Sequence, residues 1–213
     1  MDYETKNKIT LIVIAFIVGI WIGWSIYSGG STKSIPGGTP APIQTETTGG
    51  TSMAIGDYDV DIKYLYEYDV DALVIHTHNY PGFDIDSKLV PKDVALAWGS
   101  VAQFNETIDF HWSQSGRWYR WKADSYDEIA PVGGVEGVNT QSANNHLIAA
   151  DAVVKSQIKK IRRGDHVHLK GYLVNVDATK SNGNYFYWYS STSREDTGDG
   201  ACEVFYVTSV DFK

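Results

Sequence analysis

The order of structural elements in this chain is indicated by residues 151–172, which read DAVVKSQIKKIRRGDHVHLKGY. Three apolar residues recur there at a helical spacing and share one face: Val154, Ile158 and Ile161. Asp151 is a typical helix N-cap, and Gly164 stands where a C-cap belongs. We therefore predict a helix over residues 151–163, which is the one substantial helix of the chain.

A short strand follows this helix and has a glycine at each end, Gly164 and Gly171. Glycines placed in this way suit the tight coiling of a small barrel. Strands before and after a single helix are typical of an OB-like fold, so we expect a partly open OB-like β-barrel in the C-terminal half.

Most of the remaining sequence alternates apolar and polar residues and is rich in aromatic and β-branched side chains. The strands that we predict are 58–65, 68–76, 94–98, 107–112, 117–121, 167–176, 185–193 and 203–210. Asn182-Gly183 lies between two of them and is a hairpin signal. The fold class expected from these patterns is mostly β, within the α+β class.

Residues 9–28 form an uncharged apolar run, which as a helix spans about 30 Å, the thickness of a bilayer. A cleavable signal peptide would have a shorter apolar core, so we predict a single retained transmembrane helix in contact with membrane lipid. Lys6 and Lys8 precede the run, which favours a cytoplasmic N-terminus and an extracytoplasmic C-terminal domain at the cell membrane.

Three small residues, Ala15, Gly19 and Gly23, share one face of this helix and could pack against a protein partner or a second copy. Residues 29–56 are rich in Gly, Ser, Thr and Pro, and we expect a flexible linker there. The predicted organisation is therefore an anchor with its short N-terminus over 1–28, a linker over 29–56 and an extracytoplasmic domain over 57–213.

The charge and the cysteine count exclude several classes of function. The formal net charge of −8 argues against binding to nucleic acid. Cys202 is the only cysteine, so the chain has no intrachain disulfide and no site built from several cysteines.

The stretches 142–148, 164–174 and 188–203 resemble the signature of an uncharacterised prokaryotic family whose members often carry an N-terminal membrane segment. The motifs in this chain read SANNHLI, GDHVHLKGYLV and WYSSTSREDTGDGACE. The resemblance covers roughly the last 120 residues. It supports the domain boundary and the fold and implies no activity, because none is established for that family.

Cys202 and His146 suggest a cysteine nucleophile with an imidazole base, oriented by Asp196 or Asp199. A buried cysteine and a histidine bonded to backbone explain the same residues without catalysis. The triplet Asp196-Thr197-Gly198 matches an aspartic-protease motif, but no apolar strand precedes it. We therefore predict no catalytic site, and Cys202, His146 and Asp196 stay the weak candidates.

Histidine and aspartate pairs spaced two apart could ligate a metal ion, but solvated strand faces explain them as well. These pairs are His76/His78, His166/His168, Asp59/Asp61, Asp69/Asp71 and Asp84/Asp86. We expect neither a metal site nor a cofactor. The aromatic rows near Trp118 and over residues 185–189 could stack a glycan or a peptide, or could be core.

We predict that two polar segments meet at one end of the barrel and form a binding patch. One segment is Asn144-Asn145-His146, and the other is the loop from Arg194 to Gly200, which contains Asp196 and Asp199. The function expected is a membrane-tethered binding or accessory module that contacts a partner protein or an envelope component. The alternative is an extracytoplasmic hydrolase-like enzyme centred on Cys202 and His146.

Overall fold

The computed structural model describes residue 14, residues 32–193 and residues 202–213. Residues 32–213 form one compact unit, separate from residues 1–31. Its strands are β1 (Ile43–Glu46), β2 (Gly50–Ile55), β3 (Tyr58–Asn79), β4 (Lys92–Ala97), β5 (Ser113–Ser115), β6 (Trp118–Arg120), β7 (Ser142–Ala149), β8 (His166–Lys180), β9 (Tyr185–Tyr189) and β10 (Glu203–Phe212). Its helices are α2 (Ile85–Leu89), α3 (Gly99–Phe104), the short 3-10 helix η1 (Ala130–Val132), α4 (Gly134–Thr140) and α5 (Ala152–Lys160).

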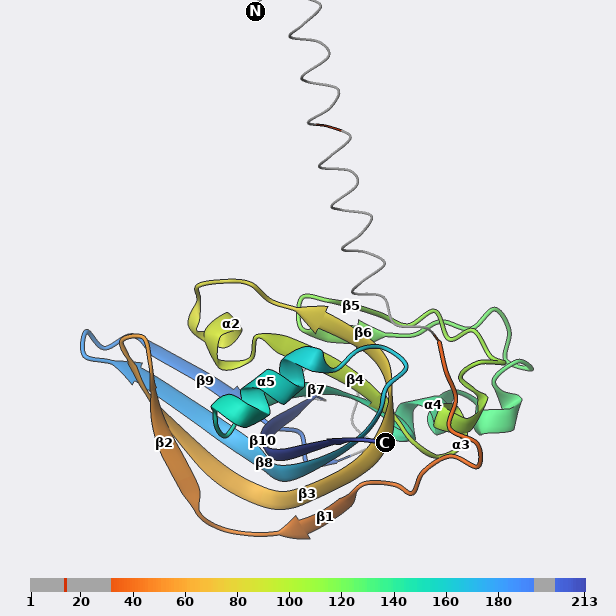
Figure 1. Cartoon of the computed structure of the whole chain (residues 1–213), viewed down its shortest axis with the longest axis horizontal. Helices are drawn as coiled ribbons and strands as arrows, with labels where there is room; N and C mark the ends of the chain where they lie inside the picture. The colour runs from red at the N-terminus through yellow and green to blue at the C-terminus, as the bar shows by residue number, and fades with distance from the viewer. Residues whose placement is uncertain (1–13, 15–31, 194–201) are drawn as a thin grey trace, which may run out of the picture. The chain divides into compact units, whose positions relative to one another are not determined.

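Five strands of the main sheet pair in a closed sequence, which makes the sheet ring-like (Figure 1). β3 pairs with β4, β4 with β7, β7 with β10, β10 with β8, and β8 with β3 again. β7 and β10 are parallel, and the other four pairs are antiparallel. β1, β2 and β9 extend the sheet beyond this ring.

β3 pairs with both β4 and β8 and so closes the ring, because two irregularities bend the strand. The register shifts at Leu65, opposite β8, and at Ile75, opposite β4. An extra residue at such a point increases the local twist of a strand. The predicted strands 58–65 and 68–76 are therefore one bent strand of 22 residues.

Two glycines occupy positions in the ring that disfavour a side chain. A Cβ at Gly171 would lie 2.0 Å from the carbonyl oxygen of Tyr206, so only glycine fits at this point of the β8–β10 pair. Gly164 has φ of +87° after α5, which a residue with a side chain adopts rarely. Gly171 lies inside β8, whereas the sequence placed it at the end of a short strand.

The predicted helix is confirmed as α5, the longest of the described helices. Asp151 caps it by accepting hydrogen bonds from the backbone N–H groups of Val153 and Val154, both at 2.8 Å. The buried residues of α5 belong to the apolar cluster inside the ring. Figure 1 shows strands of the ring curving around this helix.

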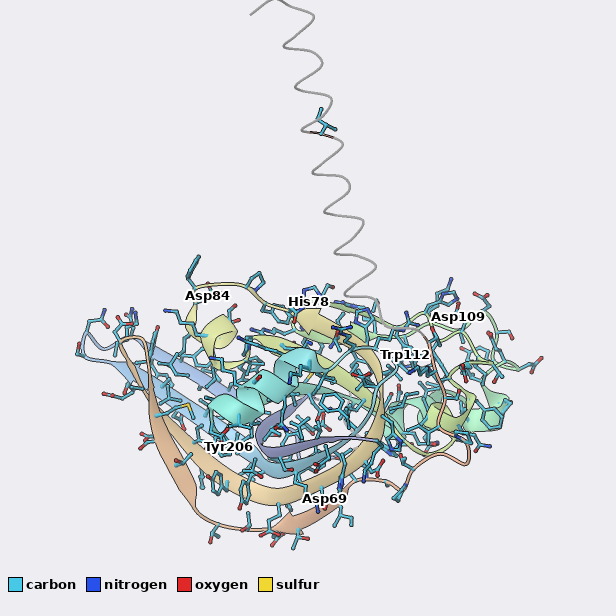
Figure 2. The ribbon with its side chains drawn as sticks, viewed as in Figure 1. Asp69, His78, Asp84, Asp109, Trp112 and Tyr206 are labelled. Carbon is cyan, nitrogen blue, oxygen red and sulfur yellow. The ribbon has the colours of Figure 1, made fainter. Side chains whose placement is uncertain are left out.

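The core consists of three apolar clusters. The first fills the ring, the second lies between the β3–β4 pair and the α3–α4 region, and the third lies under β2, β8 and β9. Figure 2 shows Trp112, of the second cluster, towards α3 and α4, and Tyr206, of the third, towards β2 and β9. The polar site described below lies between the second and third clusters.

Two predictions about strands were wrong. Residues 107–112 are not a strand: Ile108, Phe110 and Trp112 are buried as their alternation implies, but His111 has φ of +45° and breaks the extended run. No strand was predicted around His146, and Ser142–Ala149 form the strand β7. All but the last residue of β7 are buried, since β4 and β10 flank it and side chains cover both faces.

Residues 29–56 were expected to be a flexible linker, but the structure places two strands and a segment packed on the core within this range. β1 and β2 both pair with β3. Ile35 packs against the second cluster and donates its backbone N–H to Ala102 O at 3.0 Å. Polar, glycine-rich segments are ordered here because the long β3 offers them an edge to pair with.

The predicted membrane span over 9–28, with Ala15, Gly19 and Gly23, lies outside the described residues apart from Ile14. Among the helices that the structure does describe, none has the length and the apolar character needed to cross a bilayer.

Candidate functional site

A cavity of about 580 Å³ opens beside the ring of strands. Its wall combines aromatic side chains with a few polar groups: Asp86, Arg117, Trp118, His146, Phe186, Tyr187, Trp188, Tyr189 and Cys202. These residues come from α2, the β5–β6 hairpin, β7, β9 and the residue before β10. Segments far apart in the sequence therefore converge on one site.

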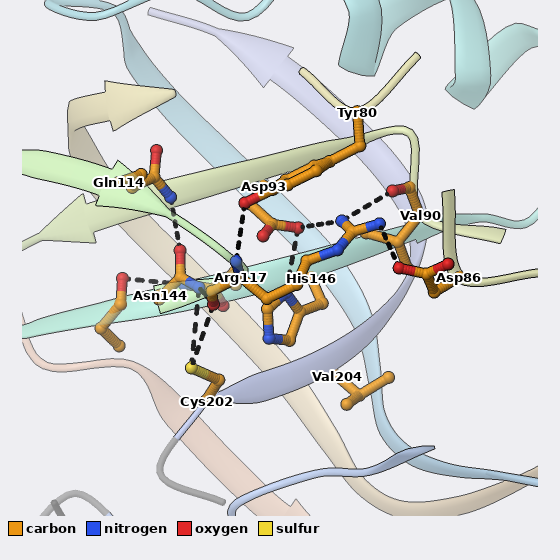
Figure 3. Close-up of polar contacts among 12 residues, drawn as sticks. Tyr80, Asp86, Val90, Asp93, Gln114, Arg117, Asn144, His146, Cys202 and Val204 are labelled. Atoms are coloured by element: carbon orange, nitrogen blue, oxygen red, sulfur yellow. Dashed lines mark hydrogen bonds and ion pairs between the residues drawn. The ribbon is translucent and has the colours of Figure 1, made fainter. Parts of the chain in front are cut away.

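Arg117 lies at the centre of the polar network (Figure 3). Its Nη1 donates to Asp93 Oδ1 and to Val90 O, both at 2.9 Å, and its Nη2 lies 3.3 Å from Asp86 Oδ2. The guanidinium carbon is 3.5 Å from the centroid of the Tyr80 ring. The positive charge of Arg117 is thus held between two carboxylates and an aromatic face.

The hairpin turn explains how Arg117 reaches this position. Gly116 and Arg117 form the two-residue turn between β5 and β6, and both have positive φ, +58° and +70°. Two such residues make a type I′ turn, which matches the twist of a hairpin. Positive φ is uncommon for arginine, and the contacts with Asp93 and Asp86 offset its cost.

Asp93 and His146 face each other across the β4–β7 pair. His146 Nδ1 lies 2.9 Å from Asp93 Oδ1, and the two groups form an ion pair when the imidazole is protonated. Asp93 is completely buried and His146 is 2% exposed. The imidazole lies against Trp188, with ring centroids 4.3 Å apart.

Burial raises the pKa of Tyr80 to about 12, and the charge of Asp93 adds to the effect. The Tyr80 hydroxyl therefore stays protonated at neutral pH. It accepts a hydrogen bond from the backbone N–H of Arg117 at 2.9 Å. Tyr80 thus fixes both the backbone and the guanidinium of Arg117.

A second chain of hydrogen bonds runs beside the first. Gln114 Oε1 lies 2.9 Å from His76 Nδ1, and Gln114 Nε2 donates to Asn144 Oδ1 at 2.6 Å. Asn144 Nδ2 donates to Arg117 O at 2.9 Å and lies 3.6 Å from Cys202 Sγ. Burial lowers the pKa of His76, so its ring is neutral and its Nδ1–H donates to the glutamine.

The structure brings together part of the predicted patch. Asn144 and His146 share one face of β7, and Cys202 is beside Asn144. Asn145 lies between them on β7 and donates to Ala143 O at 3.3 Å. Arg194, Asp196 and Asp199 lie outside the described residues, so their meeting with His146 stays a prediction.

Sequence reasoning missed the residues that organise the site, Asp93, Arg117 and Tyr80. Two signals could have indicated Asp93 and Arg117: an aspartate directly before the apolar residues 94–97, and an arginine directly after a glycine between two predicted strands. Their meeting depends on the β4–β7 register and on the turn, which no local pattern reveals.

The histidine pairs considered for metal binding have other partners. His166 pairs with Asp71, and His168 Nε2 lies 2.5 Å from Asp69 Oδ1. In residues 32–193 and 202–213, no group of three His, Cys, Asp or Glu side chains could hold a metal ion. Each histidine of the pair 166/168 thus binds a carboxylate of the neighbouring strand.

Comparisons with known proteins leave the chain without an assigned family. No family model, no curated protein and no solved structure matches it.

Proposed function

We propose that this chain is a membrane-tethered, extracytoplasmic binding module built on an OB-like barrel, and that the cavity holds its ligand. The closed ring, the parallel β7–β10 pair and α5 between β7 and β8 support the OB-like assignment. OB folds present ligands on the face of their second and third strands and on the loops beside it. The resemblance to an uncharacterised family of membrane-anchored proteins agrees with this proposal.

The position of the cavity carries the proposal. β4 and β7 are the second and third strands of the ring, and His146 of β7 lines the cavity. Asp86 comes from the connection between the first and second strands. β9 and Cys202 come from the connection between the fourth and fifth. These are the elements that carry ligands in OB folds.

The chemistry of the lining favours a neutral, ring-bearing ligand. Asp93 and Asp86 already compensate the charge of Arg117, so the lining residues that the structure describes offer no spare cation to an anionic ligand. The aromatic wall of Trp118, Phe186 and Trp188 provides stacking faces. We therefore propose a neutral saccharide of the cell envelope as the ligand class.

The membrane attachment is part of the same proposal. Thr32 belongs to the folded unit and accepts a hydrogen bond from Arg163 Nη2 at 2.8 Å. Only residues 29–31 then separate the unit from the proposed span over 9–28. External protease should digest residues 32–213 in intact cells, after permeabilisation of any outer membrane, and full protection would contradict this topology.

Tryptophan fluorescence of the full chain in a polyoxyethylene detergent tests the ligand class. We expect saturable binding of an uncharged N-acetylglucosamine trisaccharide and none of a galacturonic acid trisaccharide. Trp188→Leu should weaken binding about 2- to 10-fold, because one stacked ring is lost. The control Tyr126→Leu changes an aromatic side chain that is 80% exposed and lies outside the cavity lining. Equal loss in both variants, or preference for the acidic trisaccharide, would contradict the proposal.

A second candidate function is thiol chemistry at Cys202, and one observation favours it. His146 and Cys202 line the same cavity, and the buried Asp93 lies beside the imidazole. A catalytic thiol has a pKa well below about 8.5, so it reacts with iodoacetamide near pH 6. Fast labelling at that pH, lost in His146→Gln, would favour the enzyme over the binding module.

A further inference from the structure

The outer face of β9 carries three exposed tyrosines. Tyr185, Tyr187 and Tyr189 are 55%, 62% and 48% exposed. They alternate with Phe186 and Trp188, which pack against the third apolar cluster. Because those two residues already fill the inner face of the strand, core packing does not account for the tyrosines. Large apolar surfaces left in solvent mark interaction sites.

The three rings surround one carboxylate. Asp177 of β8 is in register with Tyr187, so both side chains lie on the same face. It accepts a hydrogen bond from the Tyr185 hydroxyl and another, at 3.0 Å, from the Tyr189 hydroxyl. The ring centroids of neighbouring tyrosines are 6.0 and 5.3 Å apart. The hydrogen bond to Asp177 also raises the pKa of Tyr185, which keeps its hydroxyl a donor.

The neighbouring strand adds negative charge to this face. Asp61 is in register with Asp177, and Asp59 lies two pairs further along, opposite Thr179, and therefore on the same face. Lys63 is the cation of β3 on the same face. The nearby Lys180 already pairs with Asp57 at 2.9 Å and lies over the Tyr58 ring. A ligand of this face therefore meets aromatic rings and carboxylates, which together favour a cation.

We propose that Tyr185, Tyr187, Tyr189 and Asp177, here called the tyrosine cluster, bind an alkylammonium group. The negative faces of the rings attract the methyl or methylene shell of such a cation, and Asp177 compensates its charge. The ammonium is that of a choline-type headgroup, because Asp177 already accepts hydrogen bonds from two tyrosine hydroxyls and a quaternary ammonium donates none. The cluster borders the cavity, because Tyr187 and Tyr189 also line it, whereas Asp177 and Tyr185 do not.

The test compares a cation with its neutral isostere. Choline and 3,3-dimethylbutan-1-ol have nearly the same shape, and only choline is charged. Saturation-transfer NMR on the full chain, in the same polyoxyethylene detergent, reports binding through the methyl groups of each compound. We expect saturable binding of choline at millimolar concentration and no saturable binding of the alcohol. Equal binding of both would overturn the proposal.

Matched variants separate the cluster from the general acidity of the protein. Asp177→Asn and Asp127→Asn each remove one negative charge, but Asp127 lies in an exposed turn between β6 and η1 and is not part of the tyrosine cluster. Tyr187→Leu should weaken choline binding about 2- to 5-fold, as expected for one exposed cation–π contact. We expect Asp177→Asn to weaken it further and Asp127→Asn to leave it unchanged. Equal effects of the two aspartate variants would refute the site.

Two further probes identify the source of the ammonium, and one control separates this site from the proposed function. Tighter binding of phosphocholine than of acetyl-Gly-Lys-Gly-amide supports the choline-type headgroup, and the reverse order, which indicates a lysine of a partner, would overturn it. Binding of neither probe would contradict the proposal. Asp177→Asn should still bind the neutral trisaccharide, so that failure at one site is distinguishable from failure at the other.

Discussion

Replacing Arg117 by methionine should strongly destabilise the folded unit. Methionine keeps much of the apolar stem and removes the guanidinium, which contacts Asp93, Asp86 and the Val90 carbonyl. Asp93 is completely buried, so it would lose its main compensating charge without gaining water. His146 Nδ1 would stay 2.9 Å from Asp93 Oδ1, and it compensates the carboxylate only when the imidazole is protonated.

The expected magnitude follows from the burial of the pair. Removing one partner of a buried ion pair costs about 3–5 kcal/mol, because the other charge is left in a poorly solvated place. The Arg117 side chain is 15% exposed, so solvent screening reduces this cost only slightly. The double variant Arg117→Met/Asp93→Asn removes the stranded charge, so it should recover part of the loss.

Urea unfolding followed by tryptophan fluorescence measures this effect as a change in midpoint at constant slope. Arg120→Met is the matched control, since Arg120 lies in the same hairpin and its Nη1 contacts only the exposed Ser115 Oγ, at 2.8 Å. We expect its effect to stay within about 0.5 kcal/mol. An Arg117→Met effect below about 1 kcal/mol, or a double variant less stable than Arg117→Met, would refute the reasoning.

Three more outcomes follow from the fold. Asp151→Ala should cost about 0.5–2 kcal/mol in the same urea assay, because the cap of α5 is lost. Gly171→Ala should cost about 1–3 kcal/mol or more, since its Cβ would meet Tyr206 O, whereas Gly183→Ala, with open space at its Cβ, is the milder control. Burial lowers the pKa of Lys92 from 10.5 to about 8, so the unfolded chain binds more protons between these values. The free energy of unfolding should therefore rise with pH from about 8 to 9.5, and Lys92→Met should flatten that slope.

Local patterns fixed the elements whose cause is local. The helix α5 could be predicted because Asp151 and the apolar spacing act within one segment. β8, β9 and β10 could be predicted because each is rich in aromatic or β-branched residues within its own length. Residues 107–112 were predicted as a strand from similar residue types, but they form none. Their alternate side chains are buried although the backbone does not pair with another strand.

The candidate site shows the same division. His146, Asn144 and Cys202 attracted notice as polar or reactive residues in short motifs, and the structure puts them beside one cavity. The ion pairs that organise the cavity join Arg117 to Asp93 and Asp86, which are 24 and 31 residues away in the sequence. Composition carries no information about which distant residues will meet.

The sequence by itself determined the mostly β character, the position of α5 and the acidic composition, because these depend on residue type and on short-range spacing. Only the tertiary structure decided that β1 and β2 belong to the folded unit and that β3 bends at Leu65 and Ile75. It also decided that the charge of Arg117 is compensated inside the cavity wall. Strand register and ion pairing join residues far apart in the chain, and the free energy that selects among such pairings belongs to the whole packed domain.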